Sequence, residues 1–136
     1  MLLNKLNLKK IKGDASFRKF YRKKIGNKKS IIVFANKEKK KNLLIYDAIN
    51  SLLIKNKILA PKLYNENYTN NFIEIEDFGD NIIFNLLKKK QNQKISLYKK
   101  SVDLVNKIQK IKQNNTKDFK GKNYKIPTYD NMKLFA

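Results

Sequence analysis

The feature that most constrains this chain is an amphipathic stretch at residues 42–58 with strand-like segments on both sides. Pro61 ends any continuation of a helix here, because proline restricts the residue before it to extended conformations. The spacing of the apolar residues predicts a helix that packs one stripe against a neighbouring sheet. The stripe consists of Ile45, Ala48, Ile49, Leu52 and Leu53.

A hairpin is predicted on each side of this helix. The turns are expected at Gly26-Asn27 and Thr69-Asn70-Asn71, whose residue types favour tight turns. Strand-like segments lie at 17–25, 30–35, 62–68 and 72–76. The order that we expect is a helix, three strands with turns, the long helix, two strands and then helices, which indicates an α+β fold with an antiparallel sheet.

The remaining segments carry weaker patterns. Leu2, Leu3 and Leu6 suit a short helix that ends at Gly13, and a second short helix is expected at 82–88. A further helix is predicted from the stripe Tyr98, Val102, Val105 and Ile108. Segments 91–94 and 113–122 are expected to be loops, and the tail is polar and irregular.

Composition excludes several classes of protein. The chain has no cysteine and no histidine, so we expect neither disulfides nor a structural zinc site. The apolar runs 30–35 and 49–54 fall far short of the roughly 20 residues that cross a bilayer. The first residues also lack the pattern of a signal peptide. We therefore expect a cytoplasmic protein without a membrane partner.

The formal charge of +21 ordinarily indicates a nucleic-acid partner, because clustered cations release phosphate counterions. However, Arg18 and Arg22 are the only arginines, and lysine, asparagine and isoleucine make up nearly half of the chain. An AT-rich genome accounts for this bias, and the run Lys39-Lys40-Lys41 fits a solvated connection. RNA or DNA binding stays an alternative, through lysines interleaved with Phe17, Phe20, Tyr21 and Tyr64.

One motif points to a nucleotide. The segment 13–22, read as Gly-Asp-Ala-Ser-Phe-Arg-Lys-Phe-Tyr-Arg, resembles the nucleotide loop and following strand of the aminoglycoside phosphotransferase family. It is most similar to the kinases that phosphorylate N-acetylmuramate and N-acetylglucosamine at the anomeric carbon. Small residues let backbone N–H groups approach phosphates, whereas the alternative is an ordinary turn. The resemblance implies nucleotide binding by Gly13, Asp14, Ala15, Ser16, Phe17, Arg18 and Arg22.

A second motif, residues 75–80, is similar to the hinge between the two lobes of that family. The resemblance implies that backbone groups of Glu76, Asp77 and Phe78 bond the adenine edge. Asp77-Phe78-Gly79 also spells the magnesium-binding triplet of protein kinases, but no catalytic loop precedes it. The alternative is a turn after an edge strand. Ala60-Pro61 and residues 126–130 extend the resemblance.

One charge usual in such kinases is missing, because the expected third strand, 31–35, contains no lysine to hold phosphates. Arg18, Arg22 or Lys37 could replace it, and Asp47 is the nearest candidate for a partner carboxylate. For Lys37 and Asp47 the ordinary expectation is exposure to solvent.

The resemblance implies a protein-kinase-like N-terminal lobe, a twisted antiparallel sheet with a packed helix, at residues 1–80. Residues 81–136 would begin a truncated helical lobe, which leaves apolar surface exposed on the late helices, including Val102 and Ile108. The cofactors implied are ATP and Mg²⁺, and the acceptor is a sugar or aminoglycoside-like hydroxyl compound. The family's catalytic loop, H-G-D-x-x-x-x-N, needs a histidine that this sequence lacks, so we assign no catalytic or metal residue and expect the chain alone to be inactive. A noncatalytic interaction module is a further alternative.

Overall fold

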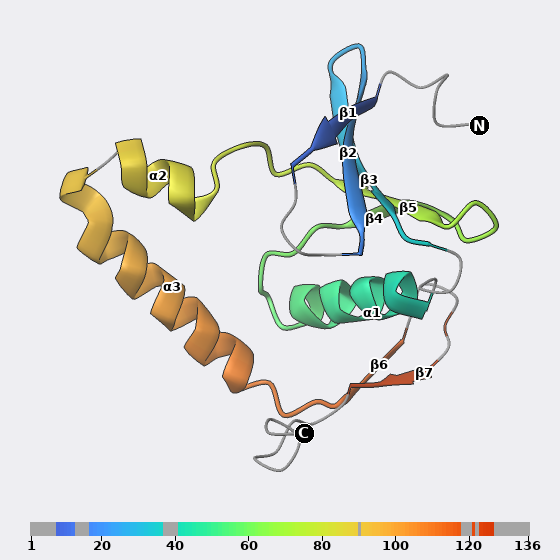
Figure 1. Ribbon diagram of the computed structural model, residues 1–136. Helices are drawn as coiled ribbons and strands as arrows, with labels where there is room; N and C mark the ends of the chain where they lie inside the picture. The colour runs from blue at the N-terminus through green and yellow to red at the C-terminus, as the bar shows by residue number, and fades with distance from the viewer. Residues whose placement is uncertain are drawn as a thin grey trace.

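A five-stranded antiparallel sheet dominates the structure, a computed structural model that describes residues 8–12, 17–36, 41–89, 91–117, 121 and 123–126. The sheet has the strand order β1-β2-β3-β5-β4. A second, two-stranded sheet pairs β6 with β7 (Figure 1). The elements are β1 (Leu8–Ile11), β2 (Lys19–Ile25), β3 (Lys28–Phe34), α1 (Lys41–Lys55), β4 (Leu63–Asn67), β5 (Phe72–Glu76), α2 (Ile83–Lys89), a 3₁₀ turn (Gln91–Gln93), α3 (Lys94–Gln109), β6 (Asn115–Lys117) and β7 (Asn123–Lys125). The α+β class with an antiparallel sheet is confirmed.

Both predicted hairpins are present. Gly26, with a φ of 57°, occupies the turn between β2 and β3, and Asn71, with a φ of 59°, ends the turn before β5. The strand β5 does not lie at an edge, because it pairs with β3 on one side and β4 on the other. The alternative interpretation placed residues 77–80 in a turn after an edge strand. It is wrong in this respect, because the strand before the turn lies inside the sheet.

The core lies between the sheet and α1. Ile31 and Val33 alternate along β3 opposite Ile75 and Ile73 of β5, so all four side chains point to one face of the sheet. Leu43 of α1 packs against this face, with Leu44 and Tyr46 partly buried beside it. This arrangement explains why the hairpins and the long helix form one folded unit.

The buried positions of α1 differ from the predicted stripe. Ile49 is exposed, whereas Asp47 is only 3% exposed, so the expected exposure of Asp47 is wrong. The reason is that α1 is covered from two directions, by the large sheet and by β6, where Thr116 is also buried. A single apolar stripe cannot describe a helix that packs on two sides.

Three other expectations need correction. Residues 8–11 form the strand β1, not a helix, while residues 1–7 lie outside the described residues. Residues 91–93 form a 3₁₀ turn that leads into α3 at Lys94, not a loop. Residues 115–117 and 123–125 pair as β6 and β7. Each strand depends on a partner elsewhere in the chain, which a short window of sequence does not reveal.

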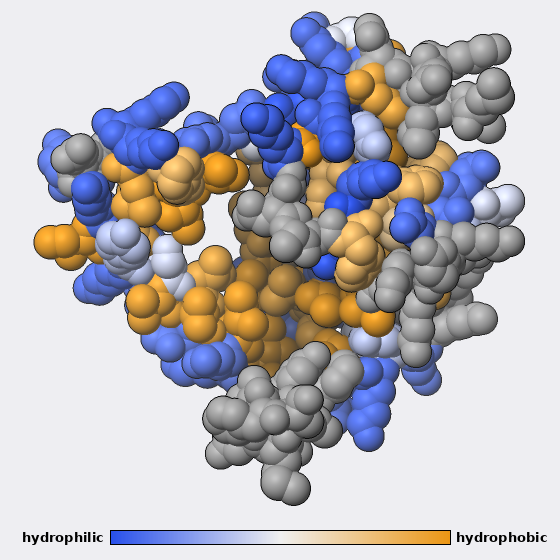
Figure 2. Space-filling model, in the orientation of Figure 1, coloured by the Kyte–Doolittle hydropathy of each residue, from blue (hydrophilic) through white to orange (hydrophobic). Residues whose placement is uncertain are grey.

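The helices α2 and α3 extend away from the sheet (Figure 1) and contact mainly each other. The space between them and the rest of the molecule is open in the space-filling view, with apolar side chains beside it (Figure 2). Val102 is 57% exposed and Ile108 is 40% exposed, so the predicted exposure of these two residues is confirmed. No helix within the described ranges is long and apolar enough to cross a membrane.

Ile73 is fully buried in β5, the strand between β3 and β4. Replacing it by alanine should destabilise the chain by about 2–5 kcal/mol, because the shortened side chain leaves a cavity. The matched control is Ile95→Ala on α3, where the side chain is 86% exposed and the free energy of unfolding should hardly change. Urea unfolding followed by circular dichroism measures both. Equal losses in the two variants would contradict the assignment of the core.

Candidate nucleotide cleft

A cleft of about 440 Å³ lies between the sheet and the connection from β5 to α2. Its volume falls within the roughly 300–1,000 Å³ usual for small-molecule sites. Strands β1, β2, β3 and β5, the helix α1 and the connection all contribute to its walls. The lining residues are Ile11, Lys12, Phe20, Arg22, Ile31, Tyr46, Pro61, Ile75, Glu76, Asp77, Phe78, Gly79, Asp80, Ile82 and Asn85.

The apolar wall of the cleft follows from strand register. Ile11 pairs with Phe20 across β1 and β2, and Ile31 pairs with Ile75 across β3 and β5. Residues directly opposite in an antiparallel sheet point to the same face, so these side chains form a continuous surface. Phe78, which is half exposed, adds an aromatic ring from the connection. The cleft therefore offers apolar contact from both the sheet and the connection.

Arg22 of β2 holds the connection in place. Its Nε donates to Oδ2 of Asp77 at 2.7 Å, and its Nη2 donates to Oδ1 of the same carboxylate at 3.1 Å. Its Nη1 donates to both carboxylate oxygens of Asp80, at 2.9 and 3.0 Å. All three guanidinium nitrogens are thus engaged, and the planar guanidinium matches the carboxylate of Asp77 in a bidentate pair.

The two aspartates differ in their surroundings. The side chain of Asp77 is 3% exposed and that of Asp80 is 80% exposed, while that of Arg22 is 21% exposed. Burial by itself raises the pKa of Asp77, but the hydrogen bonds from Arg22 and from the N–H of Gly79 outweigh it, so the pKa lies below its usual range. The hydrogen bond to Asp77, followed by that to Asp80, raises the pKa of Arg22.

The backbone of the connection is fixed at two further points. Gly79 has a φ of 76°, a conformation that side chains rarely adopt, and its N–H donates to Oδ1 of Asp77 at 2.8 Å. Asn85 of α2 donates from Nδ2 to the carbonyl of Asp80 at 3.0 Å. The sequence Asp77-Phe78-Gly79-Asp80 therefore forms an ordered turn that presents Phe78 to the cleft.

The structure brings only some of the predicted nucleotide-binding residues together. Arg22, Glu76, Asp77 and Phe78 line the cleft. The N–H of Glu76 already donates to the carbonyl of Lys62 at 2.9 Å. Of the three predicted hinge residues, only Asp77 and Phe78 could therefore offer a backbone N–H to the edge of an adenine. Gly13, Asp14, Ala15 and Ser16 lie outside the described residues, as does Lys37.

Three residues proposed from the sequence are not part of the cleft lining. The guanidinium carbon of Arg18 lies 5.1 Å from the centre of the Tyr46 ring and 5.5 Å from that of Phe17. Neither Phe17 nor Arg18 lines the cleft, and neither does the buried Asp47. Arg18 is thus placed beside α1, where it makes cation–π contacts.

Sequence reasoning missed Ile11, Lys12, Ile31 and Tyr46 as lining residues. Ile11 carried no alternating signal, because the two half-buried residues of β1, Leu8 and Ile11, flank two exposed lysines, and this segment was assigned to a helix. Lys12 follows β1 directly and adds a cation to the cleft. Within the described ranges no three histidine, cysteine, aspartate or glutamate side chains gather in a way that could hold a metal ion.

Replacing Arg22 by methionine should destabilise the chain by about 2–3 kcal/mol, because the buried carboxylate of Asp77 loses its partner. This estimate is below the value for a fully buried pair, since Arg22 is partly exposed. Asp80→Asn is the control and should cost less than about 1 kcal/mol, because Asp80 is mostly solvated. Chemical denaturation measures both variants, and similar losses in the two would contradict the dominant role of Asp77.

Stability should fall as acid protonates Asp77. A carboxylate whose pKa is lowered by folding contributes stability above its unfolded pKa, about 3.9, and loses that contribution as pH falls through the folded pKa. The wild-type free energy of unfolding should therefore decline more steeply below about pH 4 than that of Asp77→Asn. Denaturation series between about pH 6 and pH 2 test this, and parallel profiles would refute it.

Known proteins do not assign this cleft. No family model, no curated protein and no solved structure matched the chain. The interpretation of the cleft therefore rests on its own residues, and the resemblance of residues 13–22 and 75–80 to the aminoglycoside phosphotransferase family stays a prediction from the sequence.

Proposed function

We propose that this chain is the nucleotide-binding part of an ATP-dependent phosphotransferase that acts on a sugar or aminoglycoside-like hydroxyl compound. The observation that carries the proposal is the apolar cleft between the sheet and the ordered turn at residues 77–80. An adenine ring has two apolar faces and a polar edge, so it needs both an apolar slot and a nearby backbone. The sheet and α1 supply the apolar slot, and residues 77–80 supply the nearby backbone.

The polar edge of the base would meet the backbone of Phe78. Phe78 lies between β5 and α2. In the described part of the chain, its N–H and carbonyl form no hydrogen bond with another backbone group. Its ring lines the same cleft as Ile11, Phe20 and Ile31. A base in this slot would gain stacking and hydrogen bonds at once.

Lys12 is the cation that we assign to the phosphates. Arg22 was a candidate for this role, but its nitrogens are engaged by Asp77 and Asp80. Lys12 lines the cleft and directly precedes residues 13–16, the segment that resembles a nucleotide loop. A lysine just after β1 would thus take the role that a third-strand lysine has in kinases.

The arrangement of elements also supports the proposal. The resemblance implies a lobe built from an antiparallel sheet and one packed helix, and β1 to β5 with α1 have this form. The exposed apolar residues of α3, including Val102 and Val105, suit a helix that contacts a second lobe. Because the described residues hold no candidate metal cluster, we derive no step through Mg²⁺.

ATP should bind the purified chain with saturation, as measured by isothermal titration calorimetry. Phe78→Ala should weaken binding about tenfold, because one aromatic contact to the base is lost. Phe84→Ala on α2 is the matched control, since Phe84 is similarly exposed but does not line the cleft, and it should leave the affinity unchanged. Absence of ATP binding, or equal effects of the two substitutions, would overturn the proposal.

The chain itself should not phosphorylate an acceptor. Its sequence contains no histidine and hence no catalytic loop of the family's form. Incubation with ATP, magnesium and N-acetylmuramate should yield no phosphosugar. Clear product formation would refute this part of the proposal, while ATP binding measured separately would still test the cleft.

A further inference from the structure

We propose that the face of the large sheet opposite α1 binds single-stranded nucleic acid. We call this surface the outer face, and it is defined by strand register. Tyr21 pairs with Ile32 across β2 and β3, and Phe34 pairs with Phe72 across β3 and β5. Since Ile31 and Val33 point toward α1, these alternating neighbours point the other way.

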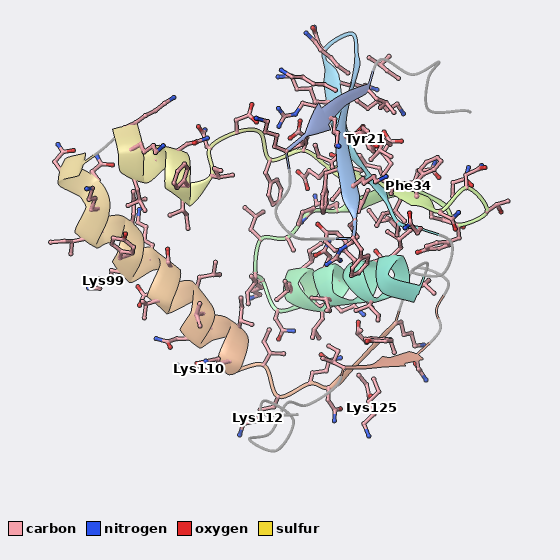
Figure 3. All side chains as sticks on the ribbon, viewed as in Figure 1. Tyr21, Phe34, Lys99, Lys110, Lys112 and Lys125 are labelled. Atoms are coloured by element: carbon pink, nitrogen blue, oxygen red, sulfur yellow. The ribbon has the colours of Figure 1, made fainter. Side chains whose placement is uncertain are left out.

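Aromatic rings and lysines occupy neighbouring positions on the outer face. Tyr21 lies opposite Lys10 of β1, and Phe34 lies opposite Lys19 of β2. Figure 3 shows Tyr21 and Phe34 on the same sheet, away from α3. Tyr21 and Phe34 are half-buried around Ile32, which is 1% exposed, so bases would stack on the accessible parts of these rings while the lysines meet the phosphates.

A second cleft of about 230 Å³ extends this surface at the β2–β3 turn. It is lined by residues that include Lys23, Lys28, Ser30, Tyr64 and Glu74. The ring of Tyr64 is 56% exposed at a break in the register between β4 and β5, the kind of irregularity that re-aims a side chain. Hydrophilic residues gather around this end of the hairpin in the space-filling view (Figure 2).

The charge of the second cleft is only partly compensated. Lys23 donates from Nζ to both carboxylate oxygens of Glu74, at 3.0 and 3.1 Å, and Ser30 donates to the same carboxylate. Among the described residues, Lys10 and Lys28 form no ion pair. They are exposed and lie at positions where a phosphate could contact them.

The aromatic content favours nucleic acid over an acidic peptide. A polyanion drawn only by the net charge of +21 would bind wherever lysines are exposed and would not depend on Tyr64. A single strand that stacks on the outer face would depend on this ring and on the lysines beside it. The two cases therefore differ in which substitutions weaken binding.

Fluorescence anisotropy with a labelled oligouridine of twelve nucleotides and the full chain tests the stacking. Tyr64→Ala should weaken the affinity about tenfold, within the range for one lost stacking contact. Tyr98→Ala on α3 is the matched control, because Tyr98 is 57% exposed, and it should have no effect. Equal effects of the two substitutions, or none from either, would overturn the proposal.

The salt dependence tests the lysines. The double variant Lys10→Gln/Lys28→Gln should reduce the slope of log affinity against log salt by about 1.4, or about 0.7 for each lost phosphate contact. Lys99→Gln/Lys110→Gln removes the same charge from α3 and from the residue that follows it, and should leave the slope unchanged (Figure 3). Equal slopes for both double variants would mean that net charge alone drives binding. Competition by polyglutamate as strong as that by unlabelled RNA would also refute the proposal.

Discussion

The cleft depends on one interaction, in which the guanidinium of Arg22 donates hydrogen bonds to the carboxylates of Asp77 and Asp80. Arg22 lies in the second strand of the sheet, whereas both aspartates follow the strand that is fifth in sequence and fourth in space. A bidentate contact fixes direction as well as distance, so the turn at 77–80 has one orientation relative to the sheet. Without it, the half-exposed ring of Phe78 would have no fixed place above the apolar wall.

The same contact gives Arg22 a role different from that of Arg18, although the sequence proposed the same role for both. Arg18 and Arg22 lie four residues apart near one motif, and both were candidates to bind phosphate. In the structure one guanidinium lies over the ring of Tyr46 and the other holds the turn. Position on a strand decided the outcome: Arg22 lies directly opposite Ile31 in β3, next to the end of β5, whereas Arg18 precedes β2.

Local pattern predicted most of the large sheet and little of the small one. The segment 72–76 was predicted with its observed bounds, because Ile73 and Ile75 alternate there with glutamates between clear turn signals. The segment 115–117 gave no such signal, since Asn115, Thr116 and Lys117 are polar, and it forms a strand through pairing with β7 and packing beside α1. The burial of Asp47 escaped prediction for a related reason, because α1 packs against β6 as well as against the large sheet.

The candidate site was predictable in part. Residues 76–78 were found because the motif at 75–80 is compact in sequence. Lys12 and Tyr46 reach the cleft only through the packing of β1 and α1, so no spacing in the sequence marks them. The link between Arg22 and Asp77 spans 55 residues and is likewise invisible to a local reading.

The pairing of β3 with β5 has a consequence for how the chain folds. Residues 30 and 76 are opposite one another, and the whole of α1 and β4 lies between them in sequence. β3 can pair with β5 only after this long loop closes. The chain therefore loses conformational entropy before it gains the contacts that stabilise the pair. The two local hairpins can form early, but the step that joins them also brings Arg22 to Asp77. The cleft is thus created in the same late event that completes the sheet.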